Sequence, residues 1–199
     1  MVCWQRNKES GFTIVELLVV IVIVAILATL TVSAYGGVSD RAQASKAMAV
    51  ANAYVKILNM YYADHDQFPS TLGGAPLSTG SVCLGNVSDY PAADGFGNGE
   101  CLYNYNDANF KVSAYQPFND QLKPYATALP NGQIARADDG SEPRRGIRYD
   151  QWSSSPYNGK FVQLVWGLKG NHIDWCGPAG QGSYSGYGVT WCILTLDMR

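Results

Sequence analysis

An uncharged run of 19 residues near the start of the chain constrains its fold more than any other feature. Residues 17–28 are twelve apolar residues without a break, and residues 29–35 extend the run without adding a charge. As a helix rising about 1.5 Å per residue, the run spans roughly 28 Å, enough to cross the apolar core of a bilayer. Arg6 and Lys8 precede the run, and such basic residues place the N-terminus in the cytoplasm. The sequence therefore predicts a transmembrane helix over residues 12–35.

Glu16, a carboxylate at the edge of this run, separates the possible interpretations. A plain signal anchor needs no particular residue there, and a secretory signal peptide would end at a small-residue site such as residues 32–34. Neither explains the charge, because a charged side chain at membrane depth costs about 2.5–3.5 kcal/mol and needs a partner or a task. The remaining alternative places Glu16 at the level of the lipid headgroups, where the cost is smaller.

Residues 8–18, with the sequence KESGFTIVELL, resemble the N-terminal signal of type IV pilins and the related pseudopilins. The resemblance implies a leader, residues 1–11, that prepilin peptidase removes by cutting between Gly11 and Phe12. It further implies that Phe12 becomes the N-methylated first residue of the mature chain. Glu16 would then be the fifth residue, the acidic position of that family.

The chemistry of this junction agrees with the resemblance. Cleavage before Phe12 would free an α-amine at the start of an apolar helix, and Glu16 lies one turn further along roughly the same face. In a staggered stack of helices, the Glu16 carboxylate of one copy can meet the amine of its neighbour. A mispaired register would leave both charges unpaired away from water, which is costly. The pair is therefore expected to set the register, while the apolar surface supplies the affinity.

Residues 36–66 are predicted to continue the helix as an amphipathic spine. Apolar residues recur there at spacings of three and four, and such a stripe is expected to pack on the chain's own head. The stripe consists of Ala47, Val50, Ala51, Tyr54, Ile57, Leu58 and Tyr61. The helix is expected to end at Asp66, because the residue before Pro69 avoids helical backbone. A continuous helix from Phe12 to Asp66 would be about 80 Å long.

Residues 67–199 are predicted to form a globular head of turns and short strands. All nine prolines lie at residue 69 or beyond, and 18 of the 21 glycines lie after residue 66. The strongest predicted elements are a hairpin of residues 101–105 and 110–115, a helical turn within 120–129, and strands at 161–168 and 187–196. The predicted fold class is α+β, a long N-terminal helix packed on an antiparallel β-sheet head.

The cysteines indicate an exported, disulfide-bonded head. Cys3 lies in the leader and would be lost on maturation, which leaves Cys83, Cys101, Cys176 and Cys192. Four cysteines allow three connectivities. Local pairing of the first two and of the last two is expected, because each bridge closes a loop rich in small polar residues and contributes about 3 kcal/mol. Zinc binding is the alternative, but no pair has the C-x2-C spacing.

No catalytic or cofactor-binding site is expected. His65 lies in a polar helix end, and His172 begins the segment 172–176, which also contains an aspartate and a cysteine that is expected to be oxidised. Residues 182–186 have tyrosine where a nucleophile elbow needs serine. The glycines within 95–99 follow no predicted strand and open no helix, so a dinucleotide site is not indicated. The sequence therefore predicts a protein that is not an enzyme.

Charged clusters are few. Asp138, Asp139 and Glu142 could hold calcium, but they lack the ordered spacing of a calcium loop, so no metal is predicted. The arginines within 144–148 are interrupted by acidic neighbours and are expected in a solvated loop. Charged residues make up 15% of the chain and the net charge is −2, which excludes a basic nucleic-acid scaffold.

The sequence predicts a structural subunit of a type IV pilus-like filament whose action is assembly. The resemblance implies these partners: copies of the chain itself, minor pilins, prepilin peptidase, and an inner-membrane assembly platform with its ATPase. The subunit would be stored as a single-pass membrane protein with a cytoplasmic N-terminus and the head outside, then join an extracellular or envelope-spanning filament. Two alternatives stay open. One is a type II secretion or competence pseudopilin or minor pilin, and the other is a monomeric, membrane-anchored surface-binding protein.

Overall fold

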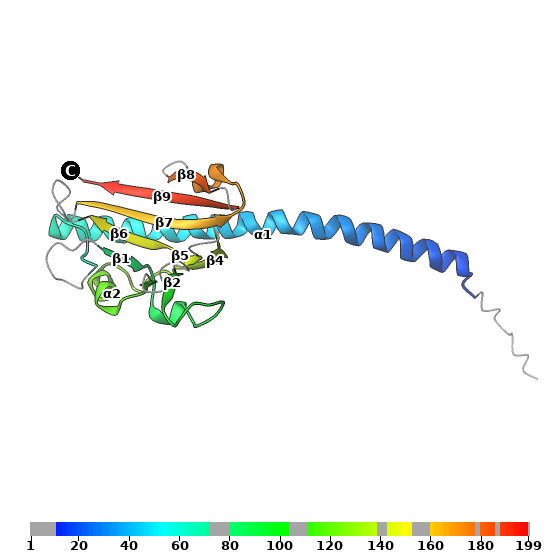
Figure 1. Ribbon diagram of the computed structural model, residues 1–199, viewed down its shortest axis with the longest axis horizontal. Coiled ribbons are helices and arrows are strands. Elements are labelled where there is room, and N and C mark those ends of the chain that lie inside the picture. The colour runs from blue at the N-terminus through cyan, green and yellow to red at the C-terminus, as the bar shows by residue number, and fades with distance from the viewer. Residues whose placement is uncertain are drawn as a thin grey trace, which may run out of the picture. The chain divides into compact units, whose positions relative to one another are not determined.

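The computed structural model describes residues 11–71, 80–103, 111–138, 143–152, 160–177, 180–185 and 188–198. The chain divides into two compact units, Met1–Ser39 and Asp40–Arg199. One helix, α1 (Ile14–His65), contributes to both (Figure 1). The second unit contains all the β-strands among the described residues, so it includes the predicted head, residues 67–199, together with the part of α1 that follows Ser39; this whole unit is called the head below.

Helix α1 confirms the predicted helix of residues 12–66 to within two residues at each end. It contains no proline, and the Gly36-Gly37 pair keeps helical backbone. Asp66 ends the helix with a left-handed φ of 52°, and its N–H still donates to the Tyr62 carbonyl at 2.8 Å. No helix in the described part of the chain is both long and apolar enough to cross a membrane. The division of α1 into a transmembrane part, residues 12–35, and a spine stays a prediction.

The larger sheet of the head has five strands, all joined in antiparallel fashion. Their order across the sheet is β1 (Gly80–Cys83), β6 (Arg148–Trp152), β7 (Phe161–Lys169), β9 (Val189–Asp197) and β8 (Gly180–Ser185). Strands β7 and β9 pair along their whole length, from Phe161 opposite Asp197 to Lys169 opposite Val189. These two strands confirm the predicted strands at 161–168 and 187–196 to within two residues (Figure 1).

The smaller sheet has four short strands. Their order is β3 (Lys111–Ser113), β2 (Glu100–Tyr103), β5 (Arg144–Gly146) and β4 (Gln133–Ala137), again antiparallel. The pairing of β2 with β3 confirms the predicted hairpin, whose turn at residues 104–110 lies outside the described residues. The smaller sheet connects to the larger one where Ala114, just after β3, forms a parallel bridge with Cys83.

Three short turns of 3-10 helix and one short α-helix complete the described elements. They are η1 (Val87–Asp89), α2 (Gln116–Leu122), η2 (Lys123–Tyr125) and η3 (Ile173–Cys176). The helical turn predicted within 120–129 begins four residues earlier, because Pro117 occupies the first helical turn, where its fixed φ and missing N–H are tolerated. Helical structure ends by Ala126, which has extended backbone.

The main core lies between α1 and the larger sheet. The predicted apolar stripe is buried, apart from Val50, which packs on the core at its edge. From the other side come residues of α2, β6, β7 and β9, chief among them Phe118, Tyr149, Leu164 and Trp166. A smaller apolar cluster around Tyr90 and Leu102 fills the space beneath the four-stranded sheet. The α+β class predicted for the chain is confirmed, with two sheets where one was expected.

The prediction that residues 144–148 form a solvated loop is wrong. Arg144 and Arg145 lie in β5 and Arg148 begins β6, and the first two are buried. Arg144 lies over the ring of Trp191, with its guanidinium carbon 4.1 Å from the ring centroid. Arg148 pairs with Asp150 at 2.8 Å. A cluster of charges predicts exposure only when nothing in the fold supplies partners, and here the neighbouring strands supply them.

Candidate functional site

The first turns of α1 carry apolar side chains on every face. Phe12 is 83% exposed, and from there to Leu30 the large apolar side chains are all exposed. They are Phe12, Ile14, Val15, Leu17, Leu18, Val19, Val20, Ile21, Val22, Ile23, Val24, Ile26, Leu27 and Leu30. A helix that is apolar all round is normally buried on all sides. In a single copy this segment lacks the cover that its composition requires, which indicates an interaction surface.

Glu16 and Thr13 form a reciprocal cap at the start of this helix. The Thr13 N–H and Oγ1 both donate to Glu16 Oε2, at 2.9 and 2.8 Å, and the Glu16 N–H donates to Thr13 Oγ1 at 3.2 Å. This is the capping-box arrangement of a Ser or Thr followed three residues later by Glu or Gln. Thr13 was missed in the sequence analysis, although the pattern Thr13-x-x-Glu16 ahead of an apolar run is its signal. The cap gives the Glu16 carboxylate hydrogen-bond partners within its own chain.

Gly11 and Phe12 lie just before the helix in non-helical backbone. A side-chain carbon added to Gly11 would meet no atom within 4 Å, so the backbone around this bond is open. Phe12 adjoins Thr13, so an α-amine formed at Phe12 would lie next to the cap. The remainder of the predicted leader, residues 1–10, falls outside the described residues. Cleavage and methylation at this junction stay predictions.

The four head cysteines form the two local bridges that the sequence analysis favoured. Cys83 pairs with Cys101 and joins β1 to β2, so it ties the two sheets together. Cys176 pairs with Cys192 and fastens η3 to β9. All four residues are buried.

One of the three acidic candidates for a metal site, Asp138, lies in the described part of the head. Asp138 accepts a hydrogen bond from Arg136 Nη2 at 2.7 Å, while Asp139 and Glu142 lie outside the described residues. Among the residues that the structure describes, no group of three or more acidic, histidine or cysteine side chains is placed to hold a metal ion. His65 packs edge-on against Tyr61, with ring centroids 4.2 Å apart, in an aromatic contact at the end of α1.

Buried tyrosines act as structural hydrogen-bond donors. The hydroxyls of Tyr54 and Tyr149 donate to the carbonyls of Pro130 and Pro69, each at 2.8 Å. Burial raises the pKa of both tyrosines, chiefly because a phenolate would lose its hydration. These hydroxyls therefore stay protonated and hold loops on the core.

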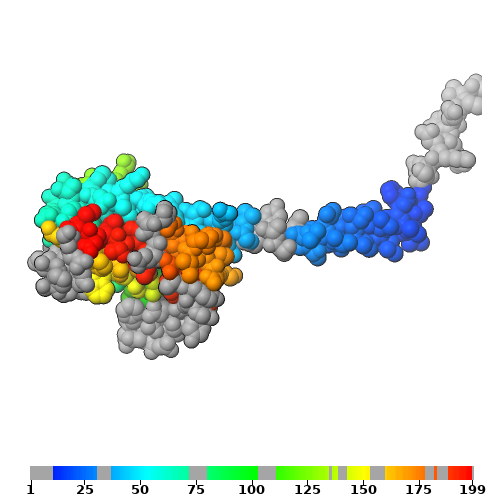
Figure 2. Space-filling model, turned by 90° about the horizontal axis from the view of Figure 1, so that it is seen from above, coloured from blue at the N-terminus to red at the C-terminus, as the bar shows by residue number. Residues whose placement is uncertain are grey.

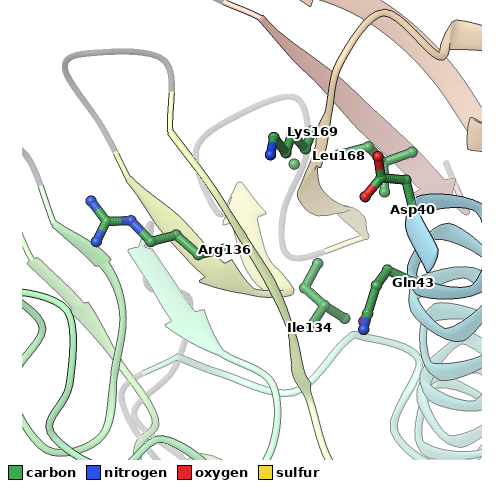
Figure 3. A pocket seen from close by; sticks show the side chains of 7 residues that line it. Asp40, Gln43, Ile134, Arg136, Leu168 and Lys169 are labelled. Carbon is green, nitrogen blue, oxygen red and sulfur yellow. The ribbon is translucent and has the colours of Figure 1, made fainter. Parts of the chain in front are cut away.

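A small hollow between α1, β4 and β7 has a volume of about 50 Å³ (Figure 3). Asp40 and Gln43 of α1 lie on one side of it, and Ile134 and Lys169 lie on the strands (Figure 3). A space of this size holds a few water molecules rather than an organic ligand.

The arrangement defines a class of protein: a disulfide-bonded β head carried on a long helix, with a capped acidic start just after a Gly-Phe junction. Residues 6–32 match the family model described as the prokaryotic N-terminal methylation motif. The chain is 33% identical over 143 residues to type II secretion system core protein G of Escherichia coli K12, covering 67% of this chain and 90% of the relative. The chain belongs to the family of type IV pilins and pseudopilins.

Other relatives match over shorter lengths. A fimbrial protein of Neisseria meningitidis serogroup B is 36% identical over 81 residues, which are 41% of this chain and 48% of the relative. Type II secretion system core protein G of Aeromonas hydrophila is 40% identical over 70 residues, 35% of this chain and 49% of the relative. In these two matches the chain spans about half the length of the relative. No solved structure matches.

Proposed function

We propose that this protein is a structural subunit of a type IV pilus-like filament, processed by prepilin peptidase and assembled through packing of its N-terminal helix. The observation that carries the proposal is the uncovered apolar start of α1, with Glu16 as its acidic residue directly after the Gly11-Phe12 junction. Before assembly the helix would hold the subunit in the inner membrane, with the N-terminus in the cytoplasm and the head outside.

The proposed mechanism joins the new amine of Phe12 to Glu16 of a neighbouring copy. Outside a filament, the Thr13 cap supplies hydrogen bonds to the carboxylate of Glu16. Within packed helices an unpaired amine or carboxylate would be costly, so only the register that pairs them is favoured. The apolar side chains around them supply the bulk of the association energy, because they leave lipid or water for contact with other helices.

The proposed partners are further copies, minor pilins, prepilin peptidase, and an assembly platform with its ATPase. A role as a type II secretion pseudopilin is the second candidate function, and one observation favours it. The match to core protein G of Escherichia coli extends over 143 residues, whereas the match to the fimbrial protein extends over 81.

Two substitutions, one at Glu16 and one at Thr13, test the assembly role of the Glu16 charge. Glu16→Gln keeps the capping-box geometry, since Gln serves at this position of the box, but it removes the charge. Thr13→Val removes the hydroxyl of the cap and keeps the charge. Each variant is expressed as the sole copy, and filaments sheared from cells are compared with the protein retained in membranes.

We expect Glu16→Gln to reduce filament yield at least tenfold, with processing and head folding unchanged, and Thr13→Val to assemble better than Glu16→Gln. Wild-type filament yield from Glu16→Gln would remove the charge from the mechanism. If the wild-type chain forms no filaments under the same conditions, a monomeric, membrane-anchored protein would be the better interpretation.

A further inference from the structure

A groove on the head is lined by residues outside the apolar segment, residues 12–30, on which the proposed assembly rests. It lies between the outer face of α1 and the turn η3, and it has a volume of about 470 Å³. That volume is within the range of roughly 300–1,000 Å³ that is typical of small-molecule sites. Figure 2 shows the orange surface around η3 beside the light-blue surface of α1. Its lining includes Arg41, Met48, Asn52, Asp174, Trp175 and Gly177.

The aromatic wall of the groove is held in place from several directions. Trp175 lies flat against the His172 imidazole, with ring centroids 3.5 Å apart and planes 2° apart. The next residue, Cys176, is joined to Cys192 of β9. The His172 N–H donates to the buried Thr190 Oγ1 at 2.8 Å. An aromatic ring fixed in this way loses little conformational freedom when a ligand binds.

The opposite wall is one face of α1. Arg41, Met48 and Asn52 lie seven and four residues apart, so they project from the same side of the helix. Gly177 brings the backbone after η3 close to this face, because a side-chain carbon at Gly177 would collide with the methyl group of Met48. Met48 on α1 and Trp175 on η3 therefore contribute apolar surface to the two walls of the groove.

Three polar side chains border this apolar surface with their hydrogen-bonding capacity unused. Among the residues that the structure describes, none forms a hydrogen bond or ion pair with the side chain of Arg41, Asn52 or Asp174. Together they offer a guanidinium, an amide and a carboxylate, that is, donors, acceptors and charges of both signs.

We propose that this groove binds a neutral saccharide. Sugar hydroxyls both donate and accept hydrogen bonds, which suits the mixed set of Arg41, Asn52 and Asp174. The C–H face of a sugar ring can pack on the apolar surface of Trp175 and Met48. Because the charges of Arg41 and Asp174 are opposite and offset each other, the groove favours neither a net negative nor a net positive ligand. The proposal is independent of filament assembly.

Binding is tested on the full chain, extracted in a detergent without a sugar headgroup and titrated calorimetrically with chitotriose and cellotriose. We expect at least one of the two to bind. Asn52→Ala should weaken that binding about five- to tenfold, because it removes one hydrogen-bonding group. The matched control is Asn59→Ala, which removes the same amide from an exposed position on the same helix outside the groove.

The charge argument has a separate test. Asp174→Asn keeps the shape of the side chain and removes the negative charge, so this variant should bind the anionic trigalacturonate more tightly than the wild type does. Circular dichroism and the absence of free thiols confirm that each variant is folded.

Three results would overturn the proposal. One is no binding of either neutral trisaccharide, and another is equal weakening by Asn52→Ala and Asn59→Ala. The third is loss of filaments in Asn52→Ala with saccharide binding unchanged, which would assign this face of the groove to a contact between copies. Normal saccharide binding by a Glu16→Gln variant that fails to assemble would support the saccharide proposal separately from the proposed function.

Discussion

Arg145 is a buried charge that organises a loop of the head. Its guanidinium donates to the carbonyls of Glu100, Pro91 and Gly97, at 2.8, 2.5 and 3.1 Å. It also lies over the Phe96 ring, 4.6 Å from the centroid. One planar, multi-donor group thus satisfies three backbone acceptors that would otherwise need separate partners.

Arg145→Lys is expected to destabilise the head by about 2–4 kcal/mol, because an ammonium cannot reach three carbonyls in one plane and leaves acceptors unsatisfied. Urea unfolding of the full chain, followed by tryptophan fluorescence, measures the change. Arg41→Lys is the control, since Arg41 is exposed and should change stability by less than about 0.5 kcal/mol. Equal stability of the two variants would contradict this role for Arg145.

The second prediction at the residue scale concerns cleavage of the Gly11–Phe12 bond. Because this bond lies in open, non-helical backbone before α1, we expect membrane-extracted protein to begin at Phe12 and to carry one added methyl group. Intact-mass measurement shows both. A chain beginning at Tyr35 would instead show cleavage of a secretory signal peptide after residues 32–34.

At the scale of elements, the length of a helix or strand determines whether the sequence alone predicts it. Helix α1 and strands β7 and β9 are long, so their patterns repeat often enough to be recognised. Strands β4 and β5 are only five and three residues long; they pair with each other, and β5 also pairs with β2, where Leu102 lies opposite Arg144. Their formation depends on tertiary partners, which a local pattern does not contain.

The candidate site divides in the same way. Gly11, Phe12 and Glu16 are predictable because they lie within one short motif. Thr13 is also predictable from the sequence, because Thr13-x-x-Glu16 is a capping-box pattern. The saccharide groove was not, since it joins Arg41 and Asn52 on α1 to Trp175, more than a hundred residues later. Only the fold brings these residues together.

The end of α1 contains an exposed ionic contact that gives a pH prediction. Asp66 accepts hydrogen bonds from Lys160 Nζ at 2.9 Å and from the Tyr62 hydroxyl at 3.1 Å. The Lys160 and Tyr62 hydrogen bonds, together with the charge of Lys160, lower the pKa of Asp66 below its usual 3.8. A carboxylate with a lowered folded-state pKa stabilises the fold above its unfolded pKa, and loses that effect as the pH falls through the folded value.

Asp66→Asn should therefore be less stable than wild type at neutral pH, with a difference that shrinks below about pH 4. Asparagine tolerates the left-handed backbone at this position, so the substitution isolates the charge. Urea unfolding between pH 7 and pH 2 measures the difference. In a double-mutant cycle, Lys160→Met should reduce the difference, with the Tyr62 hydrogen bond accounting for what remains, and a difference independent of pH would contradict the assignment.

At the scale of the whole molecule, folding and assembly depend on different parts of one chain. Among the described residues, the buried core begins at Ala44, and every member of the main core cluster lies in the second unit. The uncovered apolar side chains concentrate in the first unit, from Phe12 to Leu30. Both disulfides also lie in the second unit. The head therefore has everything that a domain needs to fold by itself.

A fragment of residues 40–199 is expected to fold as a soluble monomer when it is exported to an oxidising compartment. It keeps the whole core and both bridges, so its urea unfolding free energy should be within about 1 kcal/mol of that of the full chain. A fragment of residues 56–199 is the matched control. It loses Ala44, Ala47, Ala51 and Tyr54 from the core and should not fold. The first fragment should form no filaments, and its failure to fold with both disulfides formed would show that the first unit contributes to the stability of the head.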